Sequence, residues 1–157
     1  MTACDISLEL KDKVVHAIKT SQPINIVGSN SKYFFGHQTT GDNLEVSKHR
    51  GVINYEPDEL VLTARAGTPL SEIEQLLAKH KQMLPFEPPH FGKNATIGGT
   101  IACALSGPRR AYIGAARDFM LGCKIINGKS EIISFGGQVM KNVAGYDASG
   151  LLRREGR

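Results

Sequence analysis

The sequence has few cysteines and no long apolar run, and both absences exclude whole classes of protein. Cys4, Cys103 and Cys123 lie too far apart for an iron–sulfur or zinc site, which needs closely spaced cysteines. A membrane-spanning helix needs about 18 or more consecutive apolar residues, and the N-terminus lacks the basic and apolar segments of a signal peptide. Unpatterned cysteines suit a reducing compartment, so the sequence predicts a cytoplasmic protein.

Several familiar catalytic and nucleotide-binding patterns are also missing. No G-x-G-x-x-G follows the first expected strand, which argues against the dinucleotide fold with that fingerprint. Between Gly122 and Gly128 lie five residues, where a phosphate loop has four, and the segment between them has the composition of a strand. The five histidines are scattered, without the spacing of a metal-ligand pair. We therefore expect no metal site, and the catalytic residues stay unassigned.

Composition and charge are those of an ordinary soluble protein, with 41% hydrophobic and 22% charged residues. A chain of this length buries roughly 70% of its unfolded surface, as one domain or as two small lobes that share a ligand site. Residues 151–157 contribute +2 of the net charge of +4, through three arginines and one glutamate. No basic stripe with interleaved aromatics is present, so the charge does not indicate a nucleic-acid partner.

Hydrophobic periodicity and turn residues predict a βαβ-like first part and a second part of hairpin plus helix. The expected elements are helices over 5–20, from 69 onward and over 97–105, strands over 24–27, 44–46, 52–55 and 60–66, and a hairpin of 120–126 and 131–135. Asp5 or Ser7 is the expected cap of the first helix, and Thr68 with Glu72 resembles a capping box at the second. The proline-rich residues 85–94 are an expected loop, and the third helix is expected to be buried.

The first candidate site directly follows the strand over 24–27. Gly28, Ser29, Asn30, Ser31 and Lys32 have small or polar side chains, which allow successive backbone N–H groups to point into one concavity. Such a nest binds phosphate oxygens, and the lysine adds positive charge. An ordinary turn is the alternative for a segment of this composition.

The second candidate site opens the third helix. Gly98 and Gly99 follow Thr96 and Ile97, and two adjacent glycines permit a flat or phosphorylated ligand to come close to a helix N-terminus with free N–H groups. Close packing of the helix against a strand is the alternative reading of the same glycines.

Three further polar segments come later in the chain. Ser106 and Gly107 precede the pair Arg109 and Arg110, which offers forked hydrogen bonds to a carboxylate or phosphate or simply lies on the surface. A second segment runs over residues 114–118 (GAARD), and a third, Gly136-Gly137 followed by residues 141–147, is polar with little periodicity.

Taken together, these segments resemble a known family of flavoproteins. The order strand–GSNSK, ELVLTARAGTPLSEIEQLL and NATIGG is similar to the FAD-binding domain of the vanillyl-alcohol oxidase and p-cresol methylhydroxylase class. Within that class, LPFEPPHFG, LSGPRR and GGQVMKNVAGYD resemble the FAD-binding E subunits of bacterial glycolate oxidases. The resemblance covers about residues 5–149, nearly the whole chain.

The resemblance implies an α+β fold with two lobes and FAD between them. The first lobe, residues 1–84, is α/β-like, and the second, residues 85–149, is incomplete. The cofactor contacts that it implies are Gly28, Ser29, Asn30, Ser31, Lys32, Thr96, Ile97, Gly98, Gly99, Ser106, Gly107, Gly114, Arg117 and Asp118. Some members tether the flavin through a histidine in the first loop; residues 28–32 contain none, so noncovalent FAD is expected.

The implied activity is oxidation of glycolate or a similar 2-hydroxy acid in a heteromeric complex with a paralogous flavin subunit and an iron–sulfur subunit. Membrane association through those partners is compatible with it. Alternatives are a structural subunit that does not retain FAD, and a fragment of a related D-lactate dehydrogenase. Residues 150–157 (GLLRREGR) replace the leucine-rich continuation of the family, which favours a frameshift with early termination. This truncated chain is therefore not expected to turn over substrate alone.

Overall fold

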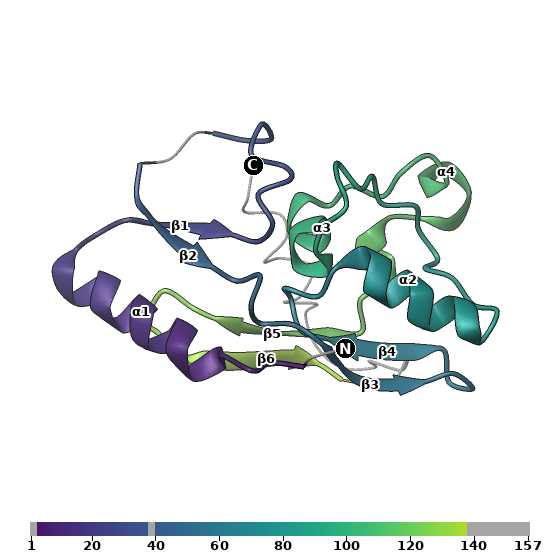
Figure 1. The fold of residues 1–157 in the computed structure, drawn as a ribbon, viewed down its shortest axis with the longest axis horizontal. Coiled ribbons are helices and arrows are strands. Elements are labelled where there is room, and N and C mark those ends of the chain that lie inside the picture. Colours follow the sequence, from purple (N-terminus) through teal and green to yellow (C-terminus); the bar gives the residue numbers. More distant parts are fainter. Residues whose placement is uncertain (1–2, 38–39, 138–157) are drawn as a thin grey trace.

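The computed structural model describes residues 3–37 and 40–137 (Figure 1). The predicted tail 150–157 and the polar segment 141–147 lie outside the described residues. The elements, in chain order, are α1 (Ser7–Thr20), β1 (Ile24–Val27), β2 (Asp42–Glu45), β3 (Val52–Glu56), β4 (Val61–Ala64), α2 (Leu70–Lys79), α3 (Ile97–Cys103), α4 (Arg110–Ile113), the 3-10 helix η1 (Ala116–Phe119), β5 (Gly122–Ile126) and β6 (Ile132–Gly136).

The described strands form three separate pairs. β1 and β2 are parallel, with Ile24 opposite Asp42, and the connection between them contains the first candidate site. β3 and β4 are antiparallel with an irregularity between Val52 and Asn54, and β5 and β6 form an antiparallel hairpin. In Figure 1, α1 lies over the hairpin, whereas α2 and α3 lie on the same side of β3 and β4. Mixed helices and strands in this arrangement confirm the α+β expectation.

α1 forms where the sequence predicts a helix, because its apolar residues recur at helical spacing. Leu10 and Val14 are buried against Leu44 of β2, and this cluster fixes the β1–β2 pair beside the helix. The cap differs from the prediction, since the N-cap is Ile6 and makes no side-chain hydrogen bond. Asp5 instead accepts hydrogen bonds from the N–H and hydroxyl of Ser7, and these bonds hold the pKa of Asp5 well below its ordinary value of 3.8.

α2 buries Leu70, Ile73 and Leu77 along one face, as its periodicity predicts. The predicted capping box is wrong, because the N-cap is Pro69 and makes no side-chain hydrogen bond. Thr68 is fully buried, and its hydroxyl accepts a hydrogen bond from the N–H of Gly51 at 2.9 Å. The Thr68 hydroxyl, which the local sequence predicts to cap α2, therefore makes a tertiary contact with Gly51 instead.

The hairpin is confirmed, but its loop is longer than a two-residue turn. Residues 127–131 connect the strands, and the Asn127 side chain accepts hydrogen bonds from the N–H groups of Lys129 and Glu131, each at 2.9 Å. Ser130 adopts a left-handed backbone with φ of 61°, and its hydroxyl donates to the Lys11 carbonyl of α1. The loop therefore also anchors the hairpin to the first helix.

α3 is a seven-residue helix that follows the proline-rich loop. The expectation of a buried helix is wrong, because Thr100 is its one buried side chain and the others are partly or largely exposed. It ends at Ala104, which has a left-handed backbone with φ of 54°. Residues 85–94 contain no helix or strand, as the prolines predict.

Candidate functional site

The loop that leaves β1 presents backbone donors without acceptors. Asn30 adopts a left-handed backbone with φ of 58°, which turns the chain so that neighbouring N–H groups change direction. Among the described residues, no hydrogen bond is recorded from the N–H groups of residues 28–32, and the loop then closes through Tyr33 N–H to the Asn30 carbonyl. These residues are partly or largely exposed and their N–H groups have no competing partner among the described residues, and anion binding by this loop stays a prediction.

Gly28 brings this loop directly against α3. A Cβ at Gly28 would lie 2.9 Å from the hydroxyl oxygen of Thr96, the N-cap of α3, so only glycine fits without displacing that side chain. The two candidate segments are more than sixty residues apart in the chain, yet they meet at this point. The structure thus joins two of the segments that the sequence singled out separately.

The N-terminus of α3 does not have the free donors that the sequence argument assumed. The N–H of Ile97 donates to the Thr68 carbonyl at 2.9 Å, and that of Gly98 donates to the Ala66 carbonyl at 2.8 Å. The next N–H, of Gly99, is capped by the Thr96 hydroxyl at 3.2 Å. Because these groups already have partners within the chain, the helix terminus itself offers no anion site.

The two adjacent glycines of α3 have different surroundings. A Cβ at Gly98 would lie 2.7 Å from the Cβ and 2.8 Å from the carbonyl oxygen of Ala66, so this glycine permits the close packing that was the alternative reading. A Cβ at Gly99 would meet only the Thr96 hydroxyl, at 3.2 Å. Within the part of the chain that the structure describes, the side of α3 at Gly99 is therefore open, whereas the side at Gly98 is filled by protein.

Thr100 is a polar group that the sequence did not single out. Its side chain is completely buried, and its hydroxyl has no hydrogen-bond partner within the part of the chain that the structure describes. An unsatisfied buried hydroxyl costs free energy. A threonine inside a short apolar run gives no sequence signal that its hydroxyl will be buried without a partner.

Ser106 and Gly107 connect the later loops to one another. Ser106 is buried; its hydroxyl accepts a hydrogen bond from Ala116 N–H at 2.9 Å, and its carbonyl accepts one from Glu87 N–H at 3.2 Å. Gly107 has φ of 74°, and a Cβ there would collide with the Glu87 carbonyl. In this structure both residues hold protein segments together.

The segment 114–118 forms a turn with internal hydrogen bonds, in addition to the bond from Ala116 N–H to Ser106. The Asp118 carboxylate accepts a hydrogen bond from the Ala115 N–H at 2.7 Å and lies 3.4 Å from Arg117 Nε. Gly114 has φ of 96°, which favours glycine. Arg109 Nη1 lies 3.9 Å from the Met83 sulfur, and forked binding of an anion by Arg109 and Arg110 stays a prediction.

Lys32 lies near α3, and its positive charge affects the pKa of the Cys103 thiol. Burial raises the pKa of Cys103 above its usual 9.0, and the positive charge of Lys32 partly opposes that rise. The thiol is therefore protonated at neutral pH and is not a thiolate nucleophile. In the described ranges no cluster of three or more histidine, cysteine or acidic side chains is placed to hold a metal ion.

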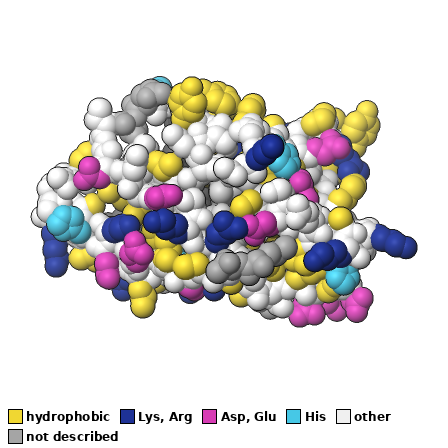
Figure 2. All heavy atoms as spheres, viewed as in Figure 1, with side chains coloured by type: hydrophobic (Ala, Val, Ile, Leu, Met, Phe, Trp, Pro, Cys, Tyr) yellow, Lys and Arg dark blue, Asp and Glu magenta, His cyan; other side chains and the backbone are white. Residues whose placement is uncertain are grey.

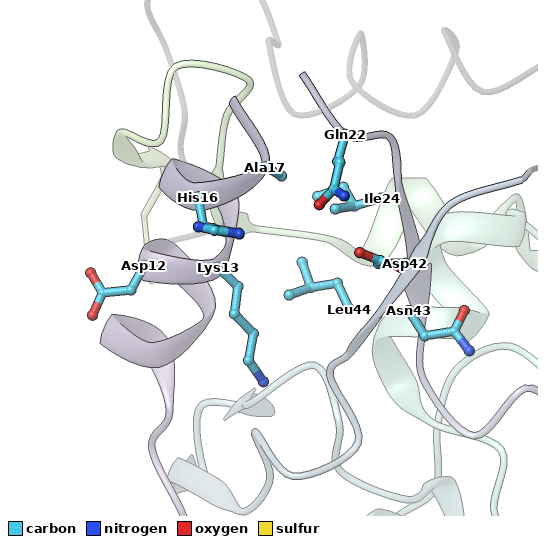
Figure 3. A pocket seen from close by; sticks show the side chains of 9 residues that line it. All are labelled: Asp12, Lys13, His16, Ala17, Gln22, Ile24, Asp42, Asn43 and Leu44. Carbon is cyan, nitrogen blue, oxygen red and sulfur yellow. The ribbon is translucent and has the colours of Figure 1, made fainter. Parts of the chain in front are cut away.

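The most clearly defined hollows lie elsewhere. A hollow of about 240 Å³ lies between α1 and the β1–β2 pair (Figure 3), and a second of about 420 Å³ lies between the start of α1 and the hairpin. The first is lined by Asp12, Lys13, His16, Ala17, Gln22, Ile24, Asp42, Asn43 and Leu44. Neither hollow is lined by a predicted cofactor residue. Over the described residues, no helix is long and apolar enough to cross a membrane.

Comparison with known proteins gives a consistent result. A family model described as an FAD binding domain matches residues 6–136. The glycolate oxidase subunit GlcE of Escherichia coli is 55% identical over 95% of this chain and 43% of its own length. Subunit GlcD of the Bacillus subtilis glycolate oxidase is 33% identical over 72% of this chain and 24% of its own length. A D-lactate dehydrogenase of Archaeoglobus fulgidus is 29% identical over 87% of this chain and 30% of its own length. The chain spans less than half the length of these relatives.

Proposed function

Because this chain belongs to the family of FAD-binding domains, we propose that it holds FAD noncovalently as the FAD-binding subunit of a complex that oxidises glycolate or a similar 2-hydroxy acid. The observation that carries the proposal is the contact of Gly28 with Thr96, because it brings a loop of unpaired N–H groups against the open side of α3. The 55% identity to the glycolate oxidase subunit of Escherichia coli supports this substrate over D-lactate, whose dehydrogenase is 29% identical.

The residues present are compatible with such a cofactor. Unpaired N–H groups in the loop 28–32 suit the phosphate oxygens of a dinucleotide, and Lys32 supplies a positive charge beside them. The buried Thr100 hydroxyl lacks a partner among the described residues, and Gly99 leaves space above the helix. Bound FAD would supply the electron acceptor for oxidation of the substrate, whereas the chain supplies binding and orientation.

The arrangement proposed is the two-lobed one of the p-cresol methylhydroxylase type. Residues 1–84 would form one lobe and residues 85–149 the other, with FAD between them. Supporting this, the loop after β1 belongs to the first range and Thr96 to the second, and they are in contact. Ser106, Gly107 and the turn 114–118 would then shape the second lobe beside the cofactor and touch it through their backbone.

Catalysis is proposed to need partners beyond this chain. No described side chain is assigned as a base or as a clamp for the substrate carboxylate, so those groups would come from elsewhere in the complex. The proposed partners are a paralogous flavin subunit and an iron–sulfur subunit, in the cytoplasm, with membrane contact through the partners. The chain alone is therefore expected to bind FAD without oxidising glycolate.

The proposal is tested by the colour of the purified chain. We expect the visible absorbance of oxidised flavin to remain with the protein after added FAD has been removed by gel filtration. Denaturation should then release all the flavin into the filtrate, because the binding is noncovalent. A folded chain that stays colourless after incubation with FAD would contradict the proposal and favour a structural subunit. Flavin that stays with the denatured chain would contradict noncovalent binding.

A further inference from the structure

Aromatic side chains lie exposed beside the loop of unpaired N–H groups. Tyr33, Phe34 and Phe35 are 70%, 56% and 52% exposed, and Phe91 of the proline-rich loop is 46% exposed. Figure 2 shows hydrophobic side chains gathered along the upper edge of the molecule, over the loop that follows β1. A contiguous exposed apolar surface of this kind marks a binding surface more often than it marks chance.

The rings form one connected group that spans two loops. The ring centroids of Phe34 and Phe91 are 5.1 Å apart with planes at 72°, and those of Tyr33 and Phe34 are 6.2 Å apart at 84°. Lys32 Nζ lies 6.0 Å from the Phe91 centroid. These edge-to-face contacts fix the rings relative to each other while leaving much of their surface in water.

We propose that Phe34 and Phe91 stack against a planar ring of the dinucleotide whose phosphates bind to the N–H groups of the loop 28–32. This inference rests on the proposed function and adds two residues to it. A dinucleotide carries flat rings on either side of a charged diphosphate, so its site needs anion-binding donors next to aromatic surface. The loop after β1 has both the N–H donors and the aromatic side chains, and Phe91 of the proline-rich loop adds a further ring.

The chemistry also explains why these particular side chains are exposed. Aromatic surface in water is unfavourable, and stacking of a planar ring on it removes part of that surface from water. Lys32 lies between the two parts and favours both a phosphate and the face of an aromatic ring. An apolar patch alone would suit many partners, whereas the adjoining N–H groups favour an anionic, ring-bearing ligand.

The test uses the full chain and four variants. Phe34→Leu and Phe91→Leu remove each ring while they keep an apolar side chain, and Phe34→Tyr keeps the ring. Tyr112→Leu is the matched control, because Tyr112 is 90% exposed on α4, which lies apart from this loop at the right of the view (Figure 1). Each variant is titrated calorimetrically with FAD, ADP and FMN, and its urea midpoint is measured to confirm that it is folded.

We expect the Kd for FAD to rise about tenfold in each leucine variant, the size of effect that loss of one stacked ring produces. Phe34→Tyr and Tyr112→Leu should bind FAD like the wild type. A loss confined to ADP assigns the stack to the adenine ring, and a loss confined to FMN assigns it to the isoalloxazine ring. Wild-type affinity for all three ligands in folded leucine variants would overturn the inference.

The outcomes separate this inference from the proposed function. A wild-type chain that binds no FAD overturns both. Wild-type FAD binding with unaffected leucine variants overturns the inference alone and leaves FAD binding intact. If those variants keep their affinity for FAD but no longer bind purified partner subunits, the inference is overturned in favour of a protein interface.

Discussion

Gly28, which directly follows β1, lies so close to Thr96 that a Cβ on the glycine would come within 2.9 Å of the threonine hydroxyl. The same hydroxyl caps α3 by accepting the N–H of Gly99. One contact thus fixes the position of the loop after β1 and the conformation of the helix start. Single substitutions at this contact should therefore affect both the loop after β1 and the start of α3. Substitutions at Gly98 and Gly99 test the other side of α3 separately.

Adjacent glycines in α3 provide a matched pair of substitutions. Gly98→Ala places a Cβ 2.7 Å from Ala66, so we expect the free energy of unfolding to fall by about 1–3 kcal/mol, as in other overpacked sites. Gly99→Ala meets only the Thr96 hydroxyl, and alanine is favoured over glycine within a helix by about 1 kcal/mol. We therefore expect Gly99→Ala to keep or raise stability in urea denaturation.

FAD titration of the same two variants distinguishes packing from ligand contact. If the cofactor approaches the open side of α3, Gly99→Ala weakens FAD binding although the protein is as stable as the wild type. Equal FAD affinity in Gly99→Ala and the wild type would show that no ligand comes near this position. Equal destabilisation by both substitutions would contradict the distinction between a filled and an open side.

Thr100 predicts an unusual gain of stability. Thr100→Val replaces a buried hydroxyl that has no partner among the described residues with a methyl group of similar size. Because an unsatisfied buried polar group costs about 1–3 kcal/mol, we expect the free energy of unfolding without FAD to rise, by about 1 kcal/mol. Thr100→Ser keeps the hydroxyl and loses the methyl, so it should be less stable than the wild type. A loss of stability in Thr100→Val would show that the hydroxyl has a partner in the free protein.

Sequence patterns were sufficient for most elements of the fold. α1 and α2 have apolar residues at helical spacing, and the β5–β6 hairpin flanks an Asn-Gly pair, so local sequence determines these elements. The loop after β1 was also predictable, because the small and polar residues Gly28 to Lys32 directly follow an apolar strand. What the sequence could not reveal is that Gly28 meets Thr96, since that contact depends on tertiary packing alone.

The errors at Thr68 and at the start of α3 have the same physical origin. Thr68 fits a helix cap locally, yet its hydroxyl bonds to Gly51, and its carbonyl accepts the N–H of Ile97. Helix-start rules treat the first N–H groups of α3 as free, but the loop before α2 supplies their acceptors. Segments that are distant in sequence thus bond both to the expected cap of α2 and to the first N–H groups of α3. Sequence patterns within one segment cannot reveal such tertiary bonds. The cofactor contacts and the division into two lobes stay predictions.

His49 predicts a pH dependence of stability. Its Nδ1 accepts the Ile6 N–H at 3.3 Å, which requires an unprotonated ring. Burial lowers the pKa of His49 below its usual 6.5, and Arg65 and Lys124 add to this effect while Asp5 opposes it. The unfolded chain therefore binds the proton first as pH falls. We expect the urea midpoint to be constant above pH 6.5 and to decrease between 6.5 and the lowered pKa of the folded state.

His49→Gln serves as the control for that pH profile, because its side-chain carbonyl can still accept the Ile6 N–H but does not titrate. The variant should lose the part of the slope that lies just below pH 6.5. Identical slopes for the variant and the wild type in this range would show that His49 is not the group responsible.

The contact between Gly28 and Thr96 is best tested by a double-mutant cycle. Gly28→Ala displaces the Thr96 hydroxyl from the Gly99 N–H, and loss of such a cap costs about 1 kcal/mol of unfolding free energy. Thr96→Ala removes the same cap and should cost a similar amount. Once that hydroxyl is absent, an alanine at position 28 meets nothing else that is as close.

The double variant should therefore be no less stable than Thr96→Ala alone, which makes the two changes sub-additive by about 1 kcal/mol. Gly128→Ala is the matched control, because a Cβ there has no neighbour within 4 Å, and it should be additive with Thr96→Ala. Urea denaturation of the six proteins measures the coupling. Additive costs for Gly28→Ala and Thr96→Ala would mean that the loop after β1 and the start of α3 do not touch in solution, and the candidate site would then lose the contact that joins its two halves.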